Sequence, residues 1–97
     1  MEDEKFDFSA EFVEKQRLWL LARRASKLKI LVEGGERALL HSPRDVVRID
    51  FALRRIKEGQ YGLCVPCGVP IEAERLKFMP ETPFCAACAK ERVRSMN

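Results

Sequence analysis

Apolar residues recur at helical spacing in two stretches of the chain. In the first stretch, intervals of three and four residues place five apolar side chains on one helical face: Leu18, Leu21, Ala25, Leu28 and Val32. The second stretch repeats this spacing in four residues: Val46, Ile49, Leu53 and Ile56. Narrow stripes of this kind are typical of two helices that pack lengthwise against each other. The pattern predicts an antiparallel, coiled-coil-like helical hairpin over residues 9–58, with helices at about 9–33 and 43–58.

Residues with known preferences for helix ends mark the limits of both helices. Ser9, or Asp7, is placed to cap the first helix, and Gly34-Gly35 ends it with residues suited to a left-handed cap. The run from Ser42 to Asp45 combines a capping serine, a proline at the first helical position and an early acid, which predicts a helix start. Residues 36–41 then form a linker with room for one short helical turn.

The beginning of the first helix departs from the stripe. Phe8, Phe12 and Trp19 lie on a different line from Leu18 and Leu21. The first helix is also longer than the second by roughly two turns, so this end overhangs its partner. We therefore expect it to contact something besides the partner helix, and the C-terminal part of the chain is the candidate.

Composition limits the class of protein. The 97 residues are 46% hydrophobic and 34% charged, with a net charge of +3, and residues 1–12 hold five acidic residues against one basic residue. We expect residues 1–8 to be an acidic, flexible N-terminus. The charge distribution also leads us to expect no sequence-specific DNA binding. The longest apolar run, Leu18 to Ala22, is too short to span a bilayer, and the acidic start is unlike a secretory signal. These features predict a soluble, cytoplasmic protein without a membrane segment.

All four cysteines lie in one C-x2-C-x17-C-x2-C pattern, formed by Cys64, Cys67, Cys85 and Cys88. Two pairs at this spacing can supply the four thiolates of a tetrahedral zinc site. Because we expect a reducing compartment, metal ligation is favoured over disulfides or a redox-active dithiol. The pattern predicts one structural Zn²⁺ held by these four residues.

The segment around the cysteines, residues 59–97, is predicted to be a zinc finger followed by a C-terminal helix from Ala86 to about Ser95. Prolines between the two cysteine pairs limit that loop to very short strands or turns. We expect its apolar residues to cluster beside the metal: Ile71, Leu76, Phe78 and Phe84. The whole chain is therefore expected to be mainly α-helical.

Several residues besides the cysteines stand at characteristic positions in the finger. They are Tyr61-Gly62, Gly68, Ile71, Arg75-Leu76 and Pro80, preceded by the helix end Ala52 to Gly59. Together with the cysteines they resemble the zinc finger of the DksA/TraR family, over roughly residues 50–90.

The resemblance implies a bacterial regulator of transcription that binds RNA polymerase directly and acts, as we expect, as a monomer. Members insert a helical hairpin or an N-terminal helix into the polymerase secondary channel, with acidic residues at its tip, and some act with guanosine tetraphosphate. The family's Asp-x-x-Asp-x-Ala tip signature is missing here. The acids nearest the hairpin turn are Glu36 and Asp45, and the N-terminal acids Asp3 and Asp7 are the alternative polymerase contacts.

Two other functions remain open from the sequence. The finger could be a structural adaptor that binds another protein or RNA through basic residues of the hairpin: Arg23, Arg24, Lys27, Arg54 and Arg55. Its zinc-bound thiolates could instead serve as a redox or metal sensor. An enzyme is not expected, because four thiolates leave no open coordination position for water or substrate.

Overall fold

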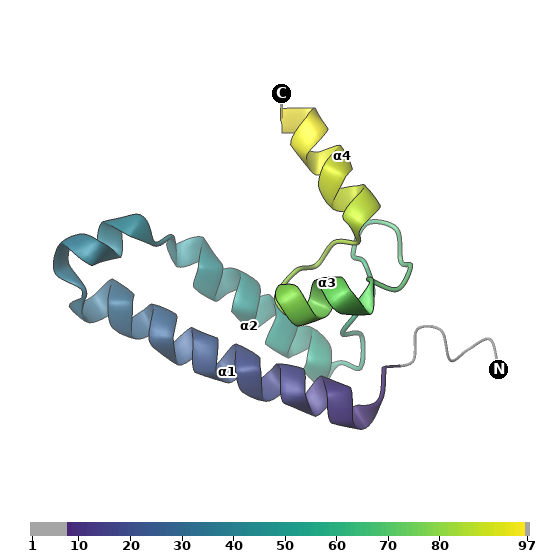
Figure 1. The fold of residues 1–97 in the computed structure, drawn as a ribbon, viewed down its shortest axis with the longest axis horizontal. Coiled ribbons are helices and arrows are strands. Elements are labelled where there is room, and N and C mark those ends of the chain that lie inside the picture. Colours follow the sequence, from purple (N-terminus) through teal and green to yellow (C-terminus); the bar gives the residue numbers. More distant parts are fainter. Residues whose placement is uncertain (1–7, 97) are drawn as a thin grey trace.

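A computed structural model describes residues 8–96 of the chain, and these form a helical hairpin beside a small cysteine-rich module (Figure 1). The helices are α1 (Ala10–Glu33), the 3₁₀ helix η2 (Gly35–Leu40), α2 (Pro43–Lys57), α3 (Ala73–Phe78) and α4 (Ala86–Met96). The described residues contain no strand, only an isolated antiparallel bridge between Leu63 and Pro70. The mainly α-helical fold that the sequence predicts is confirmed.

The arrangement in Figure 1 shows how the helices are connected in space. Helices α1 and α2 lie side by side and antiparallel, and η2 joins them at the end of the hairpin farthest from α3. Helix α4 projects away from the rest of the molecule. None of the described helices is both long and apolar enough to cross a membrane.

Side-chain caps explain where the hairpin helices begin. The Ser9 hydroxyl accepts the backbone N–H of Phe12 at 3.0 Å, and the Ser42 hydroxyl accepts that of Arg44 at 3.1 Å. Each bond satisfies an N–H group that the first helical turn leaves without a partner. Helix α1 ends at Glu33, one residue before Gly34, so the predicted helix limits agree with the observed ones to within one residue.

The hairpin has a small apolar core. Leu20 of α1 and Ile49 and Ala52 of α2 are buried, and Leu53 and Ile56 pack partly buried against them. These α2 residues include three of the four in the predicted stripe. The second helix therefore uses the face that its periodicity predicts.

The predicted stripe on the first helix is mostly wrong, since Leu28 is the one residue of the five that is partly buried. Leu18, Leu21 and Val32 are 53%, 42% and 78% exposed, whereas the buried residues of α1 are Gln16 and Leu20. Apolar residues occupy four consecutive positions here, from Leu18 to Leu21, so every helical face contains one and periodicity cannot select among them.

Two charged residues of α1 pair with acidic residues of α2. Arg24 pairs with Asp50, and the Lys27 ammonium lies 3.1 Å from an oxygen of Asp45. Lys27 lies three residues after Arg24 on α1, and its partner Asp45 lies five residues before Asp50 on α2, as antiparallel helices require. Ion pairs thus accompany the partly buried Leu28 and Val46 in this part of the hairpin.

A second correction concerns the loop between the cysteine pairs. It contains α3, a six-residue helix, where only strands or turns were expected. The flanking prolines, Pro70 and Pro80, lie outside the helix, so neither interrupts it. The linker of the hairpin is likewise helical over six residues, slightly more than the single predicted turn.

Candidate metal centre

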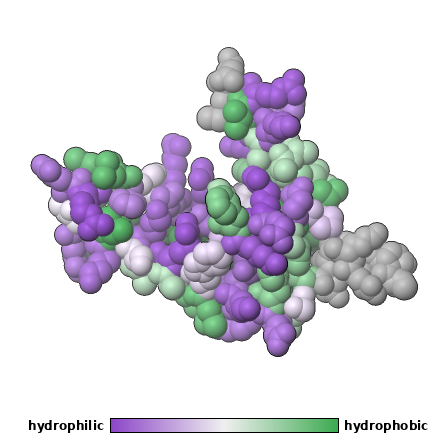
Figure 2. Space-filling model, viewed as in Figure 1, coloured by the Kyte–Doolittle hydropathy of each residue, from purple (hydrophilic) through white to green (hydrophobic). Residues whose placement is uncertain are grey.

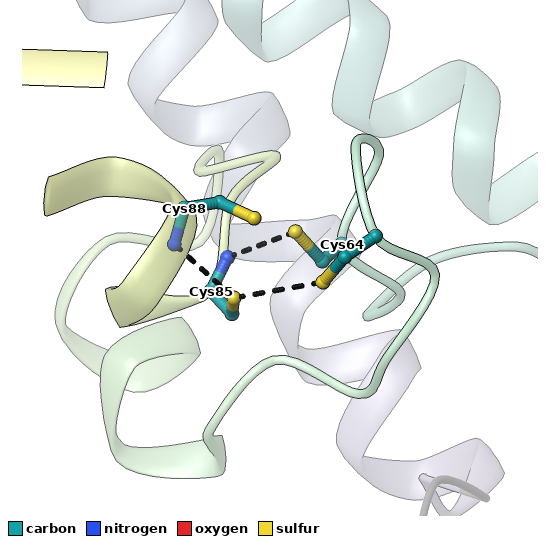
Figure 3. A group of neighbouring side chains, drawn as sticks. Cys64, Cys85 and Cys88 are labelled. Atoms are coloured by element: carbon teal, nitrogen blue, oxygen red, sulfur yellow. Dashed lines mark hydrogen bonds between the residues drawn. The ribbon is translucent and has the colours of Figure 1, made fainter. Parts of the chain in front are cut away.

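The four cysteine sulfurs come together at the start of α4. The Sγ atoms of Cys64, Cys67, Cys85 and Cys88 all lie within 4.8 Å of one another, and those of Cys67 and Cys85 are 3.9 Å apart. Figure 3 shows the side chains of Cys64, Cys85 and Cys88 directed toward a common centre. Tetrahedral Zn²⁺ with Zn–S bonds of about 2.3 Å requires sulfurs about 3.8 Å apart, so this donor set fits one zinc ion.

A tight backbone turn carries the first cysteine pair. The N–H of Gly68 donates to the carbonyl oxygen of Cys64, and the N–H of Cys64 donates to that of Val69, both at 2.8 Å. Gly68 has a φ of +77°, which side-chain-bearing residues adopt only with strain. This turn directs Cys64 and Cys67 to the same side, and it explains the glycine directly after the second cysteine.

The second pair lies at the N-terminus of α4. The N–H of Cys85 donates to Sγ of Cys64 at 3.3 Å, and the N–H of Cys88 donates to Sγ of Cys85 at 3.5 Å. Unpaired N–H groups and the helix dipole at this end favour negatively charged sulfur. The Glu72 carboxylate accepts the N–H of Ala86 at 3.2 Å and so fixes the start of the helix to the α3 segment.

Protonation of the cluster is uneven when no metal neutralises it. Burial raises the pKa of Cys64, but N–H groups of Cys85 and Cys67 and the neighbouring thiols outweigh burial and lower that pKa to about 7. The pKa of Cys88 is raised to about 12, mainly because its thiol donates to Cys64 and Cys67. Four thiolates therefore require a cation, and zinc binding must release protons.

An apolar cluster supports the cysteines from the side of the hairpin. Ile71 and Leu76 are buried together with Cys64 and Cys85, and Phe8 and Phe12 pack against them. The two phenylalanine rings stack with their centroids 5.2 Å apart. The prediction that the start of the first helix contacts the metal module is therefore confirmed.

Two members of the predicted apolar cluster behave differently from Ile71 and Leu76. Phe78 is 82% exposed, so its assignment to the cluster is wrong: it is the last residue of α3 and its side chain projects into solvent. Phe84 is half-buried, and the Arg92 guanidinium lies 4.7 Å from the centre of its ring. That contact attaches α4 to the finger.

Polar contacts from α1 fix the finger to the hairpin. Gln16 is 4% exposed, and its amide donates to the Leu76 carbonyl oxygen at 2.8 Å and to the Tyr61 hydroxyl at 3.1 Å. Two turns further on, Arg23 pairs with Glu81 at 3.2 Å. Sequence reasoning missed Gln16, because one glutamine within a charged helix gives no signal of burial.

The residues on which the family resemblance rests make contacts that stabilise the finger. The Tyr61 hydroxyl donates to the carbonyl oxygen of Pro80 at 2.9 Å, and Nε of Arg75 donates to that of Phe84 at 2.9 Å. Gly62 is buried against the Phe8 ring. These contacts hold the loop between the cysteine pairs in one conformation.

Two of the acidic residues considered as polymerase contacts, Glu36 and Asp45, lie apart from the metal centre. Glu36 is exposed on η2, at the opposite end of the hairpin from the finger. Asp45 lies near it in the first turn of α2, paired with Lys27. Asp3 and Asp7 fall outside the described residues. Of the four candidates, the two within the described residues, Glu36 and Asp45, do not lie with the cysteines.

Comparison with known protein families agrees with the geometry of the centre. Residues 59–94 match the model of the prokaryotic dksA/traR C4-type zinc finger. This segment is a DksA/TraR-type zinc finger. Its four cysteines are positioned to bind one metal ion, as that finger type does with zinc.

Individual proteins similar to this chain extend the comparison. An uncharacterized protein of Aquifex aeolicus is 49% identical over 43 residues, which are 44% of this chain and 30% of that protein. The chain thus spans less than a third of that relative.

Solved structures are similar over most of the chain. The RNA polymerase binding protein and transcriptional regulator Dks from Chlamydia trachomatis has a TM-score of 0.70 at 20% identity, over 92% of this chain and 95% of that chain. Transcription factor DksA2 from Pseudomonas aeruginosa has a TM-score of 0.53 at 27% identity, over 89% and 80%. The hairpin and the DksA/TraR-type finger therefore together form a DksA-like fold.

Proposed function

We propose that this protein is a DksA-type regulator of transcription that acts by direct contact with bacterial RNA polymerase. The observation that supports it most strongly is the joint occurrence of the finger and the hairpin. The finger matches by sequence, and the fold matches two transcription proteins over 92% and 89% of this chain, one of them described as binding RNA polymerase. We expect it to act as a monomer and without sequence-specific DNA contact.

The contacts between the finger and the hairpin suit a regulator of this kind. Gln16, Tyr61 and Arg23 connect α1 to the finger by hydrogen bonds or an ion pair, and Phe8 and Phe12 add apolar contact. These contacts hold the hairpin at a set orientation relative to the finger. A large partner can then bind the finger at one end and the tip of the hairpin at the other.

The chemistry of the metal centre supports a structural role rather than catalysis. We propose that Cys64, Cys67, Cys85 and Cys88 all ligate the zinc ion. Four thiolates fill the tetrahedral coordination sphere and leave no position at which water or a substrate could be activated. The zinc supplies folding free energy to the finger.

A nucleic-acid adaptor is less well supported. Three of the basic residues that the sequence offers for such a role already pair with acids: Arg23 with Glu81, Arg24 with Asp50 and Lys27 with Asp45. A fourth, Arg55, donates to the Leu63 carbonyl oxygen at 2.9 Å. Phosphate binding would have to compete with these internal partners.

Binding of the zinc-loaded protein to purified RNA polymerase, measured by biolayer interferometry, tests the proposal. We expect saturable binding at micromolar concentration or below, and a change in the amount of transcript initiated in vitro. The Asp45→Asn variant and a chain lacking residues 1–7 show which candidate acids contribute. Absence of binding to core enzyme and holoenzyme would reject the proposal, and steeply salt-dependent binding to RNA would favour the adaptor.

A further inference from the structure

One side of α1 carries apolar side chains that contribute little to the fold. Leu18 and Leu21 are 53% and 42% exposed, Ala25 is exposed, and Leu28 is half-buried. We call these four residues the outer stripe. Helical geometry, at about 100° per residue, places the first three on the side opposite Gln16, which faces the finger. Figure 2 shows hydrophobic groups between hydrophilic ones along the edge of the molecule that α1 forms.

The spacing of the outer stripe is that of a coiled-coil seam. Its residues follow one another at intervals of three, four and three positions, so they correspond to the a and d positions of successive heptads. A stripe this narrow suits contact with one other helix, whereas a helix that packs on a globular core has a wider apolar face. Helix α2 does not supply the contact, because its buried residues pack against Leu20 instead. The exposed members of the outer stripe therefore lack a helical partner within residues 8–96.

Basic residues flank the outer stripe on both sides. In the same heptads, Lys15 and Lys29 occupy e positions, and Arg17 and Arg24 occupy g positions. The two arginines pair with acids of this chain. Lys15 and Lys29 are exposed, and neither takes part in an ion pair of the described residues. Positive charge without a partner in residues 8–96 therefore runs along one edge of the seam.

We infer that the outer stripe docks an α-helix of another protein that has an apolar seam of its own and acidic residues along its edge. Apolar a and d side chains supply the contact area of such a pair, and opposite charges at e and g select the partner. Carboxylates of the partner helix pair with Lys15 and Lys29. The inference goes beyond the proposed function, because it gives the side of the hairpin a second protein-binding surface that does not depend on RNA polymerase.

Two other occupants fit the observations less well. In a pair of identical outer stripes, either helix orientation brings basic flanks together, since all four charged flanking positions are basic, and like charges oppose the contact. An anionic membrane surface also attracts lysines. A helix that lies on a membrane, however, gathers its apolar residues on one broad face, whereas α1 distributes them around the helix. The acidic helix satisfies both the narrow seam and its charged edge.

The test measures binding of designed peptides to the full-length, zinc-loaded protein by isothermal titration calorimetry. The acidic peptide has three heptads with leucine at a and d and glutamate at e and g, and the basic peptide has lysine in place of glutamate. We expect saturable binding of the acidic peptide below about 100 μM, and no binding of the basic peptide at the same concentrations. Leu18→Ser with Leu21→Ser should weaken binding about tenfold or more, because two apolar contacts are lost.

Charge reversal tests the edge of the seam separately. Lys15→Glu with Lys29→Glu should weaken binding of the acidic peptide and allow the basic peptide to bind. The matched controls are Val93→Ser and Lys90→Glu, which change an exposed apolar residue and an exposed lysine on α4. Both controls should leave the affinities for the two peptides unchanged.

Three results with the peptides would reject the inference. They are absence of binding to the acidic peptide, equal binding by the double leucine variant once circular dichroism shows it to be folded, and equal binding of the basic peptide to the unaltered protein. Leucine-dependent binding to phosphatidylglycerol vesicles, or a dimer in sedimentation that the leucine variant abolishes, assigns the stripe to another occupant and also overturns it. None of these measurements involves RNA polymerase, so the proposed function stands or fails separately.

Discussion

The side-chain amide of Gln16 donates to the backbone carbonyl oxygen of Leu76 at 2.8 Å, across sixty positions of sequence. The first residue belongs to the hairpin and the second to the zinc finger. Both are buried, and Leu76 belongs to the apolar cluster that contains Cys64 and Cys85. A single glutamine thus connects the long helix to the immediate surroundings of the metal centre.

Replacing Gln16 should therefore destabilise the protein without removing its zinc. We expect Gln16→Ala to lower the free energy of unfolding by about 1–3 kcal/mol, because a buried carbonyl oxygen loses its donor. Thermal unfolding followed by circular dichroism, with zinc content by mass spectrometry, measures both effects. Lys15→Ala changes an exposed neighbour on the same helix and should be nearly neutral. Equal effects of the two substitutions would contradict the role of Gln16.

Because Gly62 lies against Phe8, adding one methyl group at Gly62 should lower the stability of the protein. Gly62 has a φ of +94°, and a Cβ there would overlap the Phe8 ring. Gly59, at a φ of +74°, has no atom within 4 Å of such a Cβ. Gly59→Ala should thus cost about 1 kcal/mol from backbone strain alone, and Gly62→Ala clearly more.

A double-mutant cycle isolates the steric part of that difference. In a Phe8→Ala background, the overlap is gone, so Gly62→Ala should then cost little more than Gly59→Ala. Chemical denaturation of the unaltered protein, Phe8→Ala, Gly62→Ala and their combination gives the free energies of the cycle, and Gly59→Ala gives the reference for backbone strain. If Phe8→Ala leaves the effect of Gly62→Ala unchanged, the close approach of these two residues is not what requires the glycine.

The stability of the protein should decrease at alkaline pH through Tyr61. Burial raises the pKa of Tyr61 from 10.0 to about 12. The hydrogen bond from Gln16 opposes this increase, and the nearby charge of Glu81 adds slightly to it. The unfolded chain then loses the tyrosine proton before the folded one does, so this contribution is complete below pH 10 and is lost between pH 10 and 12. Denaturation midpoints of the unaltered protein and of Tyr61→Phe, compared from pH 8 to 12, measure it. The phenylalanine variant should show the smaller decrease across that range.

Removing a cysteine should unfold the finger and leave part of the hairpin. We expect Cys67→Ser to lose the zinc ion, to unfold residues 60–96 and to free Phe8 and Phe12 from their apolar cluster. Helical signal from α1 and α2 should remain in part, because the Leu20–Ile49–Ala52 core does not involve the metal. Val65→Ser, in the same turn and exposed, is the control. Retention of one zinc ion per chain in Cys67→Ser would refute the assignment of its ligands.

The sequence predicted some parts of this structure well, for identifiable physical reasons. Capping residues such as Ser9 and Ser42 act locally, so the helix limits follow from short stretches of sequence. The cysteine spacing identifies all four candidate ligands of the metal site. The buried face of α1 could not be predicted from the sequence, because the apolar residues Leu18 to Leu21 point in every direction around the helix. Gln16 is buried through its contacts with the finger, which is distant in sequence.

The distribution of contacts along the hairpin also implies a gradient of local stability. Its buried apolar residues lie toward the finger, whereas ion pairs such as Arg24–Asp50 and Lys27–Asp45 hold the part nearer η2. Exposed ion pairs weaken as salt screens them, and buried apolar contacts do not. Amide hydrogens should therefore exchange with solvent fastest near η2 and more slowly toward the metal, and added salt should widen that difference.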